Sequence, residues 1–137
     1  MISQLANLNW ISVLCAYVVY FILGALWFTV FFSKQYKVSL GRKGEMLPNN
    51  LIFIIGPAIC CLVITVASAL LIYALNVSSI SQAVEFSLLV GFGFLIANTV
   101  NIAINPNIPR PILYGIISGS YHFVGIVMVS GILVAMK

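Results

Sequence analysis

The sequence is poor in charge and in the residues that catalysis requires. Only six of its 137 residues are Lys or Arg and two are Glu or Asp, so charged residues make up 6% of the chain, against about 25% in soluble domains. It contains one histidine and has no paired carboxylates, Ser-His-Asp set, phosphate-binding glycine loop or clustered metal ligands. We therefore expect no enzyme, no catalytic residue, no metal site and no resident cofactor.

Cysteine is also scarce, and the positive charge is concentrated in one place. Cys15, Cys60 and Cys61 all fall inside apolar segments, where a thiol behaves as a small apolar side chain. Four of the six basic residues lie within the segment 33–50, which is typical of a membrane-orientation signal. Neither a disulfide nor nucleic-acid binding is expected.

What the sequence has in abundance is long apolar segments. Hydrophobic residues make up 63% of the chain, and the mean hydropathy is +1.19. An α-helix of about 20 mostly apolar residues crosses the hydrocarbon core while satisfying its own backbone hydrogen bonds. The pattern predicts an all-α integral membrane four-helix transmembrane bundle, one transmembrane domain over residues 1–137 in contact with the lipid bilayer. Its spans are expected at about 8–32, 51–75, 83–104 and 112–136.

The connections between the spans predict an orientation. The loop 33–50 carries four bases and the loop 105–111 carries Arg110, whereas the turn before the third span has no formal charge. By the positive-inside rule, both basic loops are expected in the cytoplasm and both termini outside. Ser79 and Gln82 have the spacing of a capping box at the start of the third helix, with Glu85 expected in its first turn.

The third span carries a periodic row of asparagines. Asn98, Asn101 and Asn105 continue a helical stripe that begins at Gly91 and Phe94. A lipid-facing asparagine would leave its amide unpaired, so this face is expected to point into protein. The amides then either join helices or line a hydrated path for a solute.

The fourth span contains His122, ten residues from Ile112 and thus about 15 Å into the helix, near the bilayer midplane. An ionisable side chain at that depth is a candidate functional residue. A contact between His122 and Asn98 is sterically reasonable. The predicted polar site within the membrane comprises His122, Asn98, Asn101, Ser118 and Tyr121. Helix packing is assigned to Gly24, Gly115, Gly119 and Gly125, the pair Gly115 and Gly119 forming a GxxxG motif. A neutral histidine bonded to a neighbouring helix is the alternative to a functional one.

The first span has an aromatic face at helical spacing. This face is expected to pack against the other spans, or to form a slot for a quinone or another flat apolar molecule. Its residues are Tyr17, Tyr20, Gly24, Trp27 and Phe31. Two tryptophans, Trp10 and Trp27, are spaced to mark the edges of the bilayer.

Two short motifs carry a family resemblance. The run Phe21-Ile-Leu-Gly-Ala-Leu-Trp-Phe28, followed by Phe31-Phe-Ser-Lys34, and the later Gly119-Ser-Tyr-His122 stand in order across the chain. The sequence resembles a family of small, four-span, mostly bacterial membrane proteins catalogued as a domain of unknown function, although Phe28 stands where tyrosine is usual. The resemblance implies a multi-pass protein of the bacterial inner membrane and highlights Gly24, Trp27, Lys34, Tyr121 and His122. It implies no activity.

Two classes of function are left open by the sequence. The first is a protein that acts without enzymatic chemistry through helix packing, as a homo-oligomer or as an accessory subunit of a larger membrane complex. The second is a channel or transporter for a small solute or protons, lined by His122, Asn98, Asn101 and Asn105. Haem or quinone binding is a weaker alternative.

Overall fold

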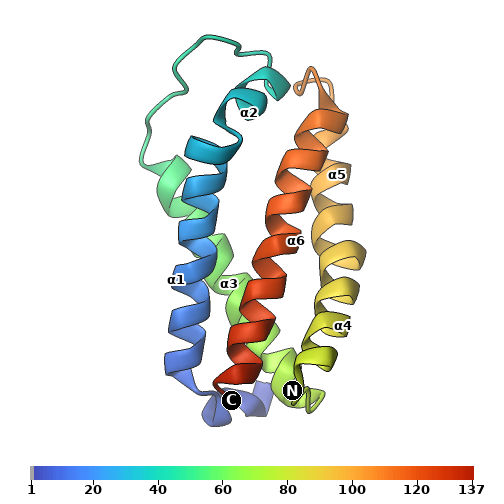
Figure 1. Cartoon of the computed structure of the whole chain (residues 1–137). Coiled ribbons are helices and arrows are strands. Elements are labelled where there is room, and N and C mark those ends of the chain that lie inside the picture. The colour runs from blue at the N-terminus through green and yellow to red at the C-terminus, as the bar shows by residue number, and fades with distance from the viewer. Residues whose placement is uncertain (1) are drawn as a thin grey trace.

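Four long apolar helices make up the structure, a computed structural model that describes residues 2–137 (Figure 1). The first span, Trp10–Phe31, is α1 (Trp10–Leu26) continued by the π-helical η2 (Trp27–Phe31). The second is α3 (Ile52–Ala74). The third span, Ile80–Ala103, joins α4 (Ile80–Val90), the π-helical η3 (Gly91–Ile96) and α5 (Ala97–Ala103). The fourth is α6 (Pro111–Ala135). Two short helices flank these spans, η1 (Ile2–Asn7) and α2 (Ser33–Ser39). The predicted all-α membrane bundle is confirmed.

The N-termini of the first and third spans are set by polar side chains. The Asn9 side chain accepts hydrogen bonds from the amides of Ile11 and Ser12, at 3.1 and 3.3 Å. Ser79 and Gln82 form the predicted capping box, in which each side chain bonds the backbone of the other's residue. These bonds satisfy amides that the helix itself leaves unpaired.

The position of the capping box shows that the expected place of Glu85, in the first turn of the third helix, was wrong. Because the third helix begins at Ile80 rather than at Ala83, its first turn holds no acidic residue. Glu85 lies in the second turn, with its side chain exposed on the outside of the bundle. It is therefore not the helix-start residue that the sequence suggested.

The last helix, α6, is the centre of the bundle. Half of the residues in its apolar 18-residue stretch are buried, against 22% of the residues in the corresponding stretch of each other span. It packs on α1, on α3 and on the whole third span. Its buried face contains glycines and serines, so the neighbouring helices approach it closely.

The second span, α3, joins the bundle through its C-terminal half only. Its buried residues run from Cys61 to Ile72, and none lies within residues 52–60. Its chief partners are α1 and α6. The apolar side chains of the first half therefore face the membrane.

The two ends of the bundle differ in charge. The short helix η1 and the C-terminus lie at the end of the bundle that holds the turn between α3 and α4, where the Lys137 ammonium donates to the Val77 carbonyl at 3.1 Å (Figure 1). At the opposite end the two long loops meet, since the Arg110 amide donates to the Ser39 carbonyl at 3.3 Å. Five of the six basic residues lie at or near that end: Lys34, Lys37, Arg42, Lys43 and Arg110.

Candidate functional site

The single histidine is paired with a tyrosine of the first span. Tyr20, on α1, is completely buried, and its hydroxyl lies 2.6 Å from Nδ1 of His122 on α6. The two rings meet edge to face, with their centroids 6.2 Å apart. Donation from the phenol to Nδ1 requires the neutral imidazole to carry its ring proton on Nε2, and donation in the reverse direction requires that proton on Nδ1.

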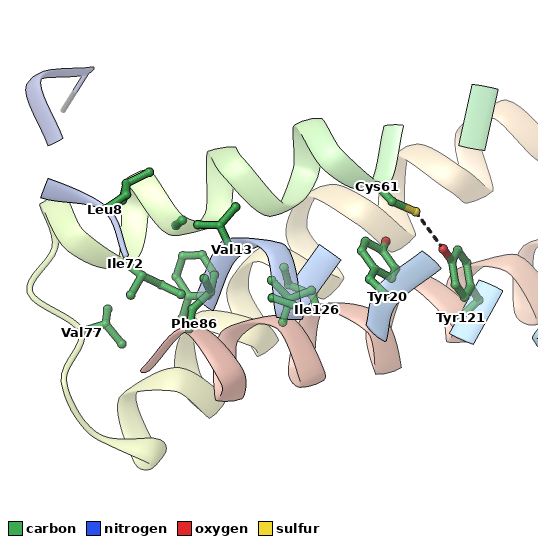
Figure 2. Packing of buried hydrophobic residues seen from close by; sticks show 13 residues of the cluster. Leu8, Val13, Tyr20, Cys61, Ile72, Val77, Phe86, Tyr121 and Ile126 are labelled. Atoms are coloured by element: carbon green, nitrogen blue, oxygen red, sulfur yellow. Dashed lines mark hydrogen bonds between the residues drawn. The ribbon is translucent and has the colours of Figure 1, made fainter. Parts of the chain in front are cut away.

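A second polar pair lies directly beside the first. Tyr121, the residue before the histidine, has its hydroxyl 3.2 Å from the Cys61 sulfur on α3 (Figure 2). The rings of Tyr20 and Tyr121 are 5.3 Å apart. Side chains of α1, α3 and α6 thus meet in one cluster, which we call the tyrosine cluster: Tyr20, Cys61, Tyr121 and His122.

Two glycines make room for this cluster. A Cβ atom on Gly125 would stand 2.1 Å from a ring carbon of Tyr20. A Cβ atom on Gly24 would stand 2.8 Å from the Tyr121 hydroxyl. Both are residues to which the sequence assigned helix packing, and here each lies under an aromatic ring of the opposite helix.

The other two predicted packing glycines face the third span. A Cβ on Gly115 would meet Val100 at 3.2 Å, and one on Gly119 would meet Ile96 at 3.5 Å. The GxxxG motif therefore packs against another helix of the same chain. It is not an open surface for a second protein.

The aromatic face of the first span is only partly as predicted. Trp27 donates its indole N–H to the Ile117 carbonyl of α6 at 3.0 Å, so its polar edge points to a neighbouring helix and not to a membrane surface. Phe31 is 56% exposed, because the π-helical turns of η2 rotate it away from the face that holds Tyr20. The aromatic packing continues through Phe28, whose ring centroid lies 5.2 Å from that of Tyr121.

Beyond the membrane-spanning segment, the same packing reaches α2. The rings of Phe28 and Tyr36 are 4.8 Å apart, and Tyr114 lies 5.8 Å beyond Tyr36. Burial, reinforced by the neighbouring Tyr114 phenol, raises the pKa of Tyr36 to about 12. Tyr36 is therefore a neutral, half-buried ring at physiological pH.

The asparagines do not join the histidine. Asn98 and Asn101 are exposed on the outside of the third span, and within residues 2–137 no hydrogen bond engages either side chain. Asn105 is half-buried and bonds back to the Ile102 carbonyl at 2.6 Å. The asparagine face therefore points away from the centre of the bundle, and the contact between His122 and Asn98 is not found.

The π-helical segment explains why this inference failed. The predicted stripe assumed regular α-helical spacing from Gly91 onward, but η3 spans Gly91–Ile96. Gly91 is buried against Phe123, whereas Phe94 is 65% exposed. The wider π turns break the stripe, so the residues beyond it no longer share the face of Gly91.

Ser118 is the remaining member of the predicted site. It is 4% exposed, and its hydroxyl is the one fully buried side-chain polar atom within residues 2–137 that lacks a hydrogen-bond partner. It lies on the buried face of α6, four residues before His122. The structure thus keeps Ser118, Tyr121 and His122 on the inside and places Asn98 and Asn101 outside.

Sequence reasoning missed the partners of the polar residues. It placed Tyr20 on a packing face and Cys61 among inert thiols, although a phenol and an imidazole in apolar spans each require a partner. A further pair, Ser87 and Ser130, joins α4 to α6 with its hydroxyl oxygens 2.5 Å apart. In each case the sequence shows a side chain that ends in a polar group within an apolar span. Which residue that group bonds depends on how the two helices are rotated about their axes.

The chemistry available to the tyrosine cluster is hydrogen bonding and proton exchange between neutral groups. No group of three or more His, Cys, Asp or Glu side chains able to hold a metal ion occurs within residues 2–137. The thiols of Cys15 and Cys60 are exposed and that of Cys61 is buried, all three as free cysteines.

Four apolar membrane-length helices, with α6 at their centre, define a multi-pass helical membrane protein. Residues 11–134 match the family model described as "Protein of unknown function (DUF1761)", and the chain belongs to that family. No curated protein and no solved structure matches the sequence.

Proposed function

We propose that this protein acts without enzymatic chemistry, as a subunit of a membrane assembly that forms through the outside of its third span. The observation that supports this proposal is a set of four exposed residues that combine small size with amide groups. We call this set the outer face: Gly93, Ala97, Asn98 and Asn101.

The residue types of the outer face are those that join helices in membranes. Around Gly93 there is open space, since a Cβ atom there would meet nothing within 4 Å. Small residues spaced about four apart let two backbones approach, and asparagines hydrogen-bond across such interfaces for about 0.6 kcal/mol each, at most about 1.7. Lipid chains offer the amides no partner, so a second helix is the better neighbour.

A second copy of the chain is one such neighbour. An amide carries both donors and an acceptor, so the same face on two copies can pair with itself about a twofold axis. A homo-oligomer is therefore the first form of the proposal, and an accessory subunit of a larger membrane complex is the second.

The test is Gly93→Leu, with Gly56→Leu as its matched control. At both glycines a Cβ atom would meet nothing within 4 Å, so both leucine side chains begin in open space. Gly93→Leu is expected to weaken association in lipid bicelles by about 1–3 kcal/mol, the usual cost of overfilling a packed contact. Energy transfer between labelled copies measures it.

Gly56→Leu is expected to associate as the parent protein does. Equal association of the Gly93→Leu variant and the parent would reject the outer face as the contact. A parent protein that stays monomeric at all concentrations would reject the homo-oligomer, and co-purification from native membranes would then test the accessory form.

The tyrosine cluster favours a second candidate function, a path for protons or a small polar solute. The supporting observation is the 2.6 Å contact between Tyr20 and His122, deep inside membrane-spanning helices. An ionisable group at that depth is costly and is often retained for transport. Under this proposal His122→Leu abolishes a flux into reconstituted vesicles, and Tyr20→Phe reduces it. Equal flux in both variants and the parent would exclude the path.

The proposed orientation places the basic end in the cytoplasm of a bacterial cell. It is supported by the five bases at that end and by the positive-inside rule. Reporter fusions test it: a periplasm-specific enzyme fused after Lys137 is expected to be active, and the same enzyme inserted at Gly44 to be inactive. The reverse result would invert the orientation.

A further inference from the structure

A membrane-facing groove runs along α6 from its first residue towards its middle. A depression of about 390 Å³ lies at the start of the helix, where Arg110, Ile112 and Ile116 line it. A second, of about 330 Å³, continues between α6 and the third span. Ile112 and Ile116 line both depressions, which therefore adjoin along this side of α6, and we call the two together the α6 groove.

The second depression lies where α6 meets the third span. It is lined by Gly115 and Gly119 of α6 and by Val100 and Ile96 of the third span, which pack on these glycines. At a rise of 1.5 Å per residue, Ile112 and Gly119 lie about 10.5 Å apart along α6. The walls of the α6 groove are almost entirely aliphatic, which suits a hydrocarbon chain.

The outer end of the groove is charged. Arg110 is exposed, and no hydrogen bond or ion pair within residues 2–137 engages its guanidinium. The neighbouring loop brings four further bases to this end and only one carboxylate, Glu45. The opposite end has Lys137 alone, and its ammonium is already bonded to a carbonyl. The groove therefore opens beneath a concentrated positive charge.

From this arrangement we propose that the α6 groove binds an anionic phospholipid, with the phosphate on Arg110 and one acyl chain along Ile116 towards Gly119. A phospholipid presents its phosphate at the membrane surface and its chain below, in the same order as the charge and the apolar groove. Guanidinium pairs with phosphate through two parallel hydrogen bonds, and basic pockets beside membrane helices bind anionic headgroups. This proposal does not depend on the outer face or on the tyrosine cluster.

A transmembrane helix fits the α6 groove less well. Its apolar surface would cover Arg110 without supplying an anion, and an unpaired charge covered in this way is costly.

The test compares lipids that differ only in headgroup. The protein is reconstituted in nanodiscs of equal phosphatidylglycerol and phosphatidylcholine with identical chains, and native mass spectrometry counts the lipid that stays bound. The parent is expected to retain phosphatidylglycerol preferentially. Arg110→Gln is expected to reduce this preference about fivefold, as one interfacial base contributes about 1 kcal/mol to binding an anionic lipid.

The matched control for charge is Arg42→Gln, which removes one base from the same end but outside the groove. It is expected to reduce the preference less than twofold. The control for shape is Ile59→Trp, set against Ile116→Trp, which fills the groove. Both isoleucines are more than half exposed, so neither change disturbs the core. Only Ile116→Trp is expected to lower lipid retention.

Three results would overturn the proposal. Equal losses in the two arginine variants would indicate a general surface potential, and equal retention of both lipids by the parent would indicate ordinary boundary lipid. A change of oligomeric state in Ile116→Trp with unchanged lipid retention would assign the groove to a second copy of the chain.

Discussion

Replacing Gly125 by alanine should destabilise the protein, because the position lies directly under Tyr20. The added Cβ would stand 2.1 Å from a ring carbon of a completely buried side chain. An ordinary carbon contact is about 3.5 Å, so the ring or the helix must move by roughly 1.4 Å. Overpacking of this kind costs about 1–3 kcal/mol.

Gly119 is the matched control on the same helix. A Cβ at that position would meet Ile96 at 3.5 Å, an ordinary contact. Both substitutions gain the same helix preference of alanine over glycine, roughly 0.5–1 kcal/mol, so this effect cancels in the comparison. The difference in free energy of unfolding between Gly125→Ala and Gly119→Ala therefore reports the contact with Tyr20.

The assay is equilibrium unfolding in mixed dodecylmaltoside and dodecyl sulfate micelles, followed by circular dichroism. We expect Gly119→Ala to be at least as stable as the parent and Gly125→Ala to be less stable by about 1–3 kcal/mol. Equal stability of the two variants would refute the packing of Tyr20 on α6, and with it the geometry of the tyrosine cluster.

Three further outcomes follow from the same contacts. Because the chain has one histidine, ¹⁵N NMR resolves its ring nitrogens directly, and Tyr20→Phe should shift the Nδ1 resonance of His122; an unchanged spectrum would show that the hydrogen bond is absent. Tyr36 should ionise only near pH 12, so the difference in absorbance at 295 nm between the parent and Tyr36→Phe should stay flat through pH 10; a step there would contradict its burial. Ser130→Ala removes the Ser130 hydroxyl's bonds to Ser87 and to the Ala83 carbonyl of α4, while Ser87 keeps its bond to the Ala83 carbonyl and its 3.5 Å bond to the Ile126 carbonyl of α6. We expect a loss of about 0.6 kcal/mol in the free energy of unfolding, measured against alanine at a serine bonded only within its own helix, and a loss no larger than in that control would refute a stabilising role.

The sequence was most informative about properties that depend on one helix alone, such as its length and its ends. Charge-free runs predicted four spans, and three of these both begin and end within two residues of the predicted positions. Ser79 and Gln82 predicted the capping box, because a helix N-terminus depends on neighbours in the chain. The resemblance to a family of unknown function was also recognised from the sequence, since such a family model matches residues 11–134.

The candidate site was only half predictable. Ser118, Tyr121 and His122 share the buried side of α6 as expected, but Asn98 and Asn101 point outwards. The error came from assuming α-helical spacing through Gly91–Ile96, where the chain forms π-helix. A wider helical turn changes the direction in which every later side chain of the helix points. No residue type in Gly91–Ile96 indicates that the chain forms π-helix there.

The sequence by itself determined that this protein lies in a membrane, how many times it crosses and which of its ends is basic, because these properties depend on segment length and on charge along the chain. Only the tertiary structure decided that Tyr20 pairs with His122, that Gly115 and Gly119 pack within the chain, and that the amides of the third span face outwards. These depend on how each helix is rotated about its axis, and in a chain that is apolar on every side little in the sequence distinguishes one face of a helix from another.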